Sequence, residues 1–569
     1  MRAFSSLPGE RWRNFLYFVI AIAAGLAEVW LIVGWREIDP RNLSWLVGDA
    51  AQYQIGWEFM RSDTVLRFPP TWIGRLDYPT GVSASYLDFI PLVGTPLRFV
   101  SSLLPLDFQY LGLYAVACFV LQGFFGLKLV SRFSKGDWIT TLLGGAFFLF
   151  SPILMKELYG HFALLSQWLI LACIYFYFQM SAERTPAANL LPFVAISALA
   201  GAIQPYFALM TLMVGAAAVA HALLLYRYDA ARHPDKRRVL AACLLWGALL
   251  VAGTLLSLTV FGFIVLGRPA AFVGGGYTRY AMNLLAPINP QSPWALYLRA
   301  FPVVHGWTLV GYNYLGLGVI LLLVIVLARR PALISRLWSR PLAPLTAAAL
   351  IGAMLALSTE VSFADRVLFT VPVPHFIFDV LTWFRGSARL FWPAYYLLML
   401  GAIVGLTETV PSPLIRRGVL AAALAIQFFD VLYVPHGVAG TVRAEHATSL
   451  RSPAWAAALP GRRHLVILPA WQCAAATPGG PRLWPALARL AARGGLTLNS
   501  VYLGRISNQV IHQDCDLTPA AVLRDGLRAD TVYVLNDRLA QTIGSRPQFR
   551  HDCRVADGLN LCTHNAGGG

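Results

Sequence analysis

Apolar stretches long enough to cross a lipid bilayer recur along the first 435 residues of the chain. A transmembrane helix needs about 20 predominantly apolar residues to span a hydrocarbon core about 30 Å thick. Only 13% of the 569 residues are charged and the mean hydropathy is +0.59, which is too apolar for a water-soluble globular protein of this length. The sequence therefore predicts a mainly α-helical, polytopic membrane protein.

The apolar stretches are separated by polar or charged segments. They cover residues 15–35, 108–130, 138–155, 162–180, 190–226, 237–264, 307–328, 342–358, 390–407 and 416–435. As one helix, residues 190–226 would be about 55 Å long at 1.5 Å per residue, well beyond the thickness of a bilayer. Gln204-Pro205 can end one span and begin the next, because proline interrupts a helix. With this break we predict about eleven transmembrane helices.

Basic residues decide the predicted orientation. If residues 190–226 form two spans, the basic segments 227–238, 329–340 and Arg416-Arg417 all fall on the same side of the membrane as the N-terminus, whereas a single span would invert them. Positively charged loops mark the cytoplasmic side. The net charge of +17 is explained by this pattern, so no nucleic-acid partner is expected.

The first apolar stretch is predicted to remain in the protein as a signal anchor. It follows Arg2, Arg11 and Arg13, and its end at Trp35-Arg36-Glu37 offers no small-residue cleavage site. The N-terminus is then cytoplasmic. The segments predicted to lie outside the cytoplasm are residues 36–107, 265–306, 359–389 and everything after about residue 436.

The last 134 residues, 436–569, are a different kind of sequence. Short β-rich runs at 464–469, 496–502 and 531–535 alternate with helical patterns rich in Ala, Leu and Arg at 484–493 and 519–528. This alternation predicts a small α/β domain. We therefore expect a transmembrane domain of residues 1–435, with a long first external loop at 36–107, and an extracytoplasmic domain of residues 436–569.

The cysteines agree with this placement. Cys118, Cys173 and Cys243 lie in predicted spans, where we expect buried thiols. Four others lie in the C-terminal domain. Asp557-Gly558 is a type I′ hairpin signal that places Cys553 opposite Cys562, and we predict this disulfide together with Cys473–Cys515. Disulfides form in oxidising compartments, and the alternative is four reduced thiols.

Carboxylates in the first external loop are candidates for proton transfer. Asp49 follows a glycine soon after the first span, and Asp77 and Asp88 lie in aromatic-rich segments further along. The loop mixes apolar helical pieces with carboxylates, so we expect it to lie along the membrane surface, where a sheltered carboxylate can act as a general base. For each residue the alternative is a helix cap or a loop hydrogen bond, and this alternative weighs most for Asp77 and Asp88.

Positive residues beside a span on the external face are the second candidate group. Arg385 and Arg389 are four residues apart at the mouth of a span, on one face if that stretch is helical. Two such guanidinium groups can bind a phosphate through charge-assisted hydrogen bonds. The alternatives are snorkelling at the interface or an ion pair with Asp365 or Asp379.

A third group lies at the external ends of other spans. Lys156 and His161 occupy a short predicted turn between two spans, and Tyr312 and Asn313 lie near the start of another. Polar residues at a membrane face are costly and usually line a cavity. For the histidine, a structural hydrogen bond is the simpler interpretation. By the predicted topology, all of these residues converge on the external side.

Together these motifs resemble the GT-C superfamily of integral-membrane glycosyltransferases, and most closely a bacterial branch of it. The motifs that carry the resemblance are Gly48-Asp49-Ala50-Ala51-Gln52, Tyr78-Pro79-Thr80-Gly81, Asp88-Phe89-Ile90-Pro91-Leu92, Gly160-His161, Gly311-Tyr312-Asn313-Tyr314-Leu315-Gly316 and Phe384-Arg385-Gly386-Ser387-Ala388-Arg389-Leu390-Phe391-Trp392-Pro393. Several superfamily members carry two carboxylates in the first loop, where this chain has Asp49 alone. The cofactor requirement therefore stays open, including dependence on a divalent metal.

The resemblance implies a transferase in a bacterial inner membrane that moves a sugar from a polyprenyl-phosphate donor to an envelope glycan or lipid on the periplasmic side, with inversion. It implies that Asp49 is the catalytic base. The substrate-binding residues would be Asp77, Asp88, Lys156, His161, Tyr312, Asn313, Arg385 and Arg389. The alternatives are a transporter or flippase of lipid-linked sugars, and a non-catalytic envelope assembly protein.

Overall fold

The fold is that of a mainly helical protein with one larger β-sheet. The computed structural model describes residues 8–63, 65–158, 160–228, 235–265, 276–291, 295–304, 310–432, 450–473, 476–503, 506–546, 549 and 551–565. The chain forms two compact units. The helical unit comprises Met1–Pro40, Tyr110–Ser257 and Gly275–Thr441. The sheet unit comprises Arg41–Gln109, Leu258–Gly274 and Val442–Gly569.

Each predicted span contains a helix. These helices are α1 (Pro8–Ile32), α5 (Leu111–Phe133), α6 (Trp138–Leu149) with α7 (Pro152–Glu157), α8 (Trp168–Gln179), α9 (Pro186–Gly201), α10 (Pro205–Tyr228), α11 (Lys236–Val260), α13 (Leu317–Arg329), α15 (Ala343–Leu357), α17 (Trp392–Thr409) and α18 (Pro413–Val431). Among the described residues, seven helical segments are long and apolar enough to cross a membrane, and α9, α13 and α15 are shorter apolar helices. The mainly α-helical membrane fold is confirmed, and the number of eleven spans stays a prediction.

The break predicted at Gln204-Pro205 is confirmed. Helix α9 ends at Gly201 and α10 begins at Pro205, so the long apolar stretch forms two helices. A second proline has an effect that the sequence analysis did not anticipate. The predicted span 138–155 is present as the apolar segment Trp138–Glu157, but within it α6 ends at Leu149 and Pro152 starts the separate helix α7.

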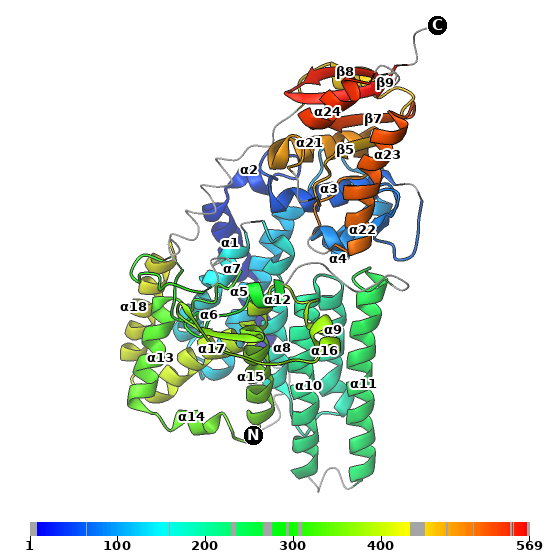
Figure 1. Ribbon diagram of the computed structural model, residues 1–569. Helices are drawn as coiled ribbons and strands as arrows, with labels where there is room; N and C mark the ends of the chain where they lie inside the picture. Colours follow the sequence, from blue (N-terminus) through cyan, green and yellow to red (C-terminus); the bar gives the residue numbers. More distant parts are fainter. Residues whose placement is uncertain are drawn as a thin grey trace. The chain divides into compact units, whose positions relative to one another are not determined.

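Glycines allow several helices of this unit to approach closely. A Cβ atom at Gly25 of α1 would lie 2.7 Å from the backbone nitrogen of Val120 in α5. A Cβ at Gly145 of α6 would lie 2.6 Å from a methyl carbon of Leu127 in α5. Small residues at helix contacts are typical of membrane proteins, where close van der Waals packing drives association. Helices α13 and α18 also run side by side in this unit (Figure 1).

Short elements link the long helices. In the helical unit they are α2 (Trp35–Ile38), η3 (Phe162–Leu165), α12 (Gly276–Arg279), α14 (Leu333–Arg336), the hairpin of β3 (Glu360–Phe363) and β4 (Arg366–Thr370), α16 (His375–Leu381) and η4 (Ser387–Phe391). At one connection, the carboxylate of Asp137 accepts hydrogen bonds from the guanidinium groups of Arg416 and Arg417. Burial alone would raise the pKa of Asp137. Hydrogen bonds from Arg417, Thr140 and Arg416 outweigh burial and hold this pKa well below its usual range.

The C-terminal part of the sheet unit is the predicted α/β domain. Its elements are α20 (Ala454–Ala458), β5 (His464–Leu468), α21 (Gly480–Arg493), β6 (Thr497–Leu498), α22 (Asn508–His512), η5 (Gln513–Leu517), α23 (Thr518–Asp525), β7 (Thr531–Leu535), α24 (Asp537–Gly544), β8 (His551–Ala556) and β9 (Leu559–His564). The sheet order is β6-β5-β7-β9-β8. Strands β6, β5 and β7 are parallel, and β9 is antiparallel to both β7 and β8.

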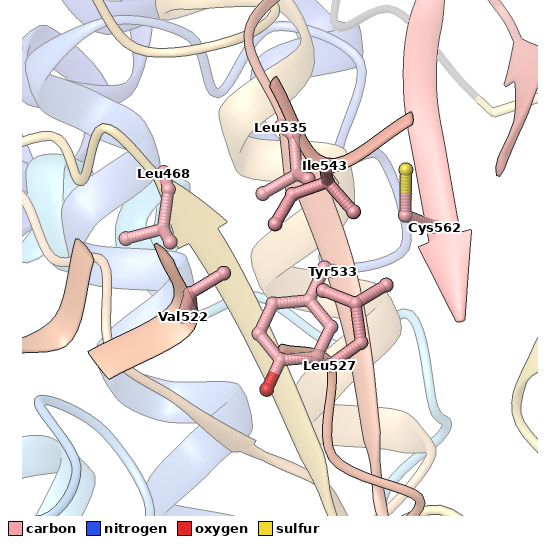
Figure 2. Close-up of a cluster of buried hydrophobic side chains, with 7 residues drawn as sticks. All are labelled: Leu468, Val522, Leu527, Tyr533, Leu535, Ile543 and Cys562. Atoms are coloured by element: carbon pink, nitrogen blue, oxygen red, sulfur yellow. The ribbon is translucent and has the colours of Figure 1, made fainter. Parts of the chain in front are cut away.

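Apolar side chains from several elements form the core of this domain. Figure 2 shows the buried cluster, which comprises Leu468, Val522, Leu527, Tyr533, Leu535, Ile543 and Cys562. The cluster joins strands β5, β7 and β9 to α23 and α24. Burying one such side chain stabilises the fold by about 1.5–3 kcal/mol, so this core can hold the small domain together.

Both predicted disulfides are present. Cys553 pairs with Cys562 across the hairpin of β8 and β9, directly opposite in the strand register. Asp557 and Gly558 at the turn have φ values of 49° and 77°, as a type I′ turn requires. Cys473 pairs with Cys515. Cys118, Cys173 and Cys243 are free and buried, as expected.

The first predicted external loop folds with this domain. Its elements are α3 (Asp49–Ser62), β1 (Trp72–Ile73), β2 (Val82–Ser83), η1 (Ala84–Leu87), α4 (Pro91–Phe99) and η2 (Ser101–Leu103). Leu76 forms a parallel bridge with Leu498 of β6. The loop thereby covers the edge of the sheet. The predicted domain boundary at 435/436 falls within 433–449, outside the described residues, and remains a prediction.

Candidate functional site

The helical unit holds a buried ion pair at the end of α7. The ammonium group of Lys156 lies 3.0 Å from Oε1 of Glu157, and the two residues are 5% and 0% exposed. The sequence analysis placed Lys156 in a turn, but α7 continues through Glu157 and the turn follows it. Burying two charges is unfavourable unless they are paired and hydrogen-bonded. An ion pair in such a place indicates a site where charge is needed.

Arg389 adds a second cation to this pair. Its charge interacts with both Lys156 and Glu157, and His161 interacts electrostatically with Glu157. The Arg389 guanidinium carbon lies 5.2 Å from the ring centroid of Tyr206. Two cations face one carboxylate, so the cluster carries a net charge of about +1 even with a neutral histidine. We call Lys156, Glu157, His161 and Arg389 the cationic cluster.

Buried polar groups extend the cationic cluster. The ring centroid of Tyr312 is 6.0 Å from Nζ of Lys156, and this tyrosine is only 2% exposed. Within the described residues, its hydroxyl group makes no hydrogen bond. A buried hydroxyl without a partner is costly. The group is therefore well suited to donate a hydrogen bond to an anionic ligand bound near Lys156.

Backbone contacts hold the segment that carries Arg385 and Arg389. Nδ2 of Asn313 donates to the carbonyl oxygen of Ala388 at 3.0 Å, and the backbone N–H of Gly386 donates to the Tyr206 hydroxyl at 2.5 Å. Asn313 is fully buried. The structure thus places Asn313 where it supports the arginine segment, and its predicted contact with a substrate stays a prediction.

The two arginines do not share a regular α-helical face. Only residues Ser387–Phe391 are helical, as a 3₁₀ helix, and Arg385 precedes them. Arg385 is exposed, and its Nη2 donates to the hydroxyl of Tyr280 at 3.0 Å. Arg389 instead lies against Tyr206. Each guanidinium is thus held by a different tyrosine.

Asp49 belongs to the sheet unit, at the first position of α3. Gly48 before it has a φ of 54°, a left-handed conformation that glycine adopts easily. The hydroxyl of Tyr502 donates to Oδ1 of Asp49 at 2.7 Å, and Nε2 of Gln52 donates to the same oxygen at 3.4 Å. A carboxylate at a helix N-terminus is stabilised by the helix dipole. Asp49 is partly exposed, so a substrate can reach it.

Asp77 lies in another part of this unit and is 2% exposed. Its side chain is hydrogen-bonded to Asp514, a buried residue that also accepts a hydrogen bond from Gln472. Burial raises the pKa of Asp514 to about 7, against the opposing effect of hydrogen bonds with Gln472 and Asp77. A hydrogen bond between two carboxyl groups requires a shared proton. Asp77 and Asp514 therefore form an acid pair.

Asp88 ends the short helix η1 with a φ of 55° and is partly exposed. The structure thus assigns local conformational roles to both Asp77 and Asp88, and their substrate contacts stay predictions. Among the described residues there is no group of three or more His, Cys, Asp or Glu side chains that could hold a metal ion.

Three residues of this unit were missed in the sequence analysis. They are Trp471, Tyr502 and Asp514, which surround the Cys473–Cys515 disulfide or contact Asp49. A signal was available for two of them, since Trp471 and Asp514 are within two residues of the predicted disulfide. Tyr502 was assigned to a strand at 496–502, but β6 ends at Leu498. Beyond Leu498, the side chain of Asn499 takes the place of the backbone hydrogen bonds between β6 and β5. It accepts from the backbone N–H of Ile467 and donates to the carbonyl oxygen of the same residue.

These features define a polytopic helical membrane protein with a small disulfide-bonded α/β domain. The chain belongs to the family described as "Domain of unknown function (DUF6311)", whose model matches residues 22–432. The model described as "DUF6311 C-terminal domain" matches residues 454–564. No curated protein matches the chain.

Two solved structures are similar to the chain. The crystal structure of ArnT from Cupriavidus metallidurans in the apo state is 12% identical, with a TM-score of 0.46 over 96% of this chain and 97% of that one. The crystal structure of the same protein bound to undecaprenyl phosphate is 13% identical, with a TM-score of 0.43 and the same coverage. ArnT is a GT-C glycosyltransferase, the superfamily that the sequence motifs resemble.

Proposed function

We propose that this protein is a membrane glycosyltransferase of the inner membrane, which moves a sugar from a polyprenyl-phosphate donor to an envelope glycan or lipid on the periplasmic side. The cationic cluster is the observation that carries the proposal. An excess of positive charge next to the unpaired hydroxyl of Tyr312, within a membrane-embedded unit, fits the phosphate of a lipid whose chain lies in the bilayer.

In the proposed reaction, an acceptor hydroxyl attacks the anomeric carbon of the donor sugar from the face opposite the phosphate. Asp49 accepts the proton of that hydroxyl as the general base. The bond between the anomeric carbon and the phosphate oxygen breaks, and its electron pair leaves with the polyprenyl phosphate. Arg389, Lys156 and Arg385 stabilise the charge of this leaving group. The anomeric configuration is inverted, because the new bond forms opposite the old one.

The other predicted site residues would bind the substrates or hold the residues that bind them. His161 and Tyr312 would complete the phosphate site, and Asn313 would hold the arginine segment through its bond to the Ala388 carbonyl. Asp77 and Asp88 would bind substrate hydroxyl groups from the sheet unit. The donor and the acceptor would be the membrane partners of the protein.

Two variants test the proposal in purified full-length protein. Asp49→Asn should lower sugar transfer in an assay with polyprenyl-phosphate-linked hexoses by roughly 100-fold or more, the usual contribution of a general base, while binding of labelled undecaprenyl phosphate is kept. Arg389→Ala should weaken that lipid binding about tenfold or more, because a charge-assisted hydrogen bond is lost. Asp107→Asn and Arg366→Ala remove exposed charges from the same two units and serve as controls.

Full transfer activity in Asp49→Asn would show that this carboxylate is not the base. The same assays separate the alternatives. A transporter or flippase of lipid-linked sugars, or an assembly protein, would bind the lipid in the Arg389-dependent manner but would form no glycosidic bond in the wild-type protein.

A further inference from the structure

Two aromatic side chains of the C-terminal domain lie beside Asp49. The rings of Trp471 and Tyr502 are 5.0 Å apart between centroids, and Trp471 also lies 5.4 Å from Trp484. Trp484 is 1% exposed, whereas Trp471 and Tyr502 are only partly buried. The buried ring of Trp484 thus packs against Trp471, which in turn packs against Tyr502. A partly exposed tryptophan that packs on a buried ring presents a broad apolar face to a ligand.

Trp471 and the two residues that follow it are each held by a specific contact. Its backbone N–H donates to Oγ of Ser500 at 2.9 Å. The next residue, Gln472, donates from Nε2 to the carboxylate of Asp514, and Cys473 forms the disulfide with Cys515. A loop residue with a backbone hydrogen bond, next to a residue bound to a buried carboxyl group and near a disulfide, loses little further entropy when a ligand binds. A rigid Trp471 side chain is therefore well suited to bind a ligand.

Tyr502 connects this surface to Asp49. Its hydroxyl donates to Oδ1 of Asp49 at 2.7 Å, although the residues are 453 positions apart in the chain. The hydrogen bond holds the Asp49 carboxylate in one orientation beside the two aromatic rings.

We propose that Trp471 and Tyr502 form an acceptor subsite for a sugar ring, in which the indole of Trp471 packs against the apolar C–H face of the ring and Tyr502 positions Asp49 toward one of its hydroxyl groups. This inference rests on the proposed function, because it identifies Asp49 as the base. It makes the acceptor a carbohydrate, and it makes the C-terminal domain part of the reaction site. In this scheme Trp471 is a binding residue and Tyr502 is a positioning residue.

The binding part is tested without catalysis. A panel of methyl hexosides and pentosides is added to the detergent-solubilised full-length protein, and binding is measured by saturation-transfer NMR. At least one glycoside should bind the wild-type protein. Trp471→Ala should weaken that binding roughly 5- to 30-fold, which corresponds to the loss of about 1–2 kcal/mol of aromatic contact. Trp471→Phe keeps an aromatic face and should retain most of the affinity.

The positioning part is tested in the transfer assay. Tyr502→Phe removes only the hydroxyl group and should lower kcat about tenfold, the value of one hydrogen bond to a charged group, with little change in the KM of the donor or the acceptor. Tyr533→Phe is the matched control, because it removes a hydroxyl from β7 of the same domain that accepts a hydrogen bond from the backbone N–H of Arg528. This control should retain wild-type kcat.

The inference is overturned if no glycoside of the panel binds the wild-type protein, or if a glycoside binds Trp471→Ala as tightly as wild type. It is also overturned if Tyr502→Phe and Tyr533→Phe have the same kcat. These failures differ from a failure of the proposed function. Loss of transfer in Asp49→Asn together with unchanged Trp471 and Tyr502 variants would reject the subsite alone, and full activity in Asp49→Asn would reject the assigned base.

Discussion

Replacement of Asp514 by asparagine should make the stability of the sheet unit less dependent on pH. This carboxyl group is 2% exposed, and burial raises its pKa from the ordinary 3.8 to about 7 in the folded protein. The folded state therefore binds a proton that the unfolded chain releases at lower pH. Below about pH 4 both states are protonated, and the carboxyl group contributes its full stabilising effect to the fold.

The magnitude follows from the two pKa values. Between about pH 4 and pH 7 the unfolded chain loses the proton while the folded protein keeps it, so the free energy of unfolding falls by about 1.4 kcal/mol per pH unit. Over the difference of about three units the loss amounts to about 4 kcal/mol. Above about pH 7 both states are ionised and the loss is complete. An asparagine cannot ionise, so Asp514→Asn should remove this part of the pH dependence.

Thermal unfolding measures the effect. The midpoint of the full-length protein in detergent is recorded by tryptophan fluorescence from about pH 4 to pH 8, under conditions that keep both disulfides oxidised. The wild-type midpoint should fall with rising pH more steeply than that of Asp514→Asn. Asp516→Asn is the control, because Asp516 is exposed and lies two residues away, where it pairs with His512. Equal pH dependence in wild type and Asp514→Asn would refute the reasoning.

Two further substitutions test the packing of each unit. Arg493→Ala removes a guanidinium partner of Glu58, which is 3% exposed. A denaturant titration should show the free energy of unfolding lowered by about 1–3 kcal/mol, because a buried charge loses its partner. An unchanged midpoint would contradict this prediction. Gly316→Ala places a Cβ atom 2.1 Å from Nε2 of Gln427, at a backbone φ of 87° that strains an alanine. Little monodisperse protein should therefore be recovered after extraction of this variant. Gly401→Ala is the control, because Gly401 has open space around it, and it should give the wild-type yield.

The sequence predicted the elements of the fold well, because their signals are local. Helix length, the proline at 205 and the turn at Asp557-Gly558 each act within a few residues, and the structure has the helices, the break and the cross-hairpin disulfide that they predict. The break at Pro152 was missed because an apolar run on both sides of a proline also fits one kinked span. Local patterns could not distinguish these two cases.

The candidate sites could be predicted only in part. The sequence analysis identified Asp49, Lys156 and Arg389 from their residue types and their places beside spans. It could not identify the contact between Asp49 and Tyr502, because no local pattern relates residues more than 450 positions apart. The contact of Asp77 with Asp514 could not be foreseen either, since Asp77 lies in a loop and Asp514 in the distant short helix η5, and only tertiary packing brings them together.

The parallel bridge between Leu76 and Leu498 has a consequence for synthesis of the protein. The sheet unit needs residues from the beginning, the middle and the end of the chain, so it cannot be completed while the ribosome is still making the helices between them. Asp49 emerges early but receives its hydrogen bond from Tyr502 only when the last domain has folded. An incomplete or misinserted chain would thus lack this hydrogen bond, and under the proposed function it would also lack an oriented base.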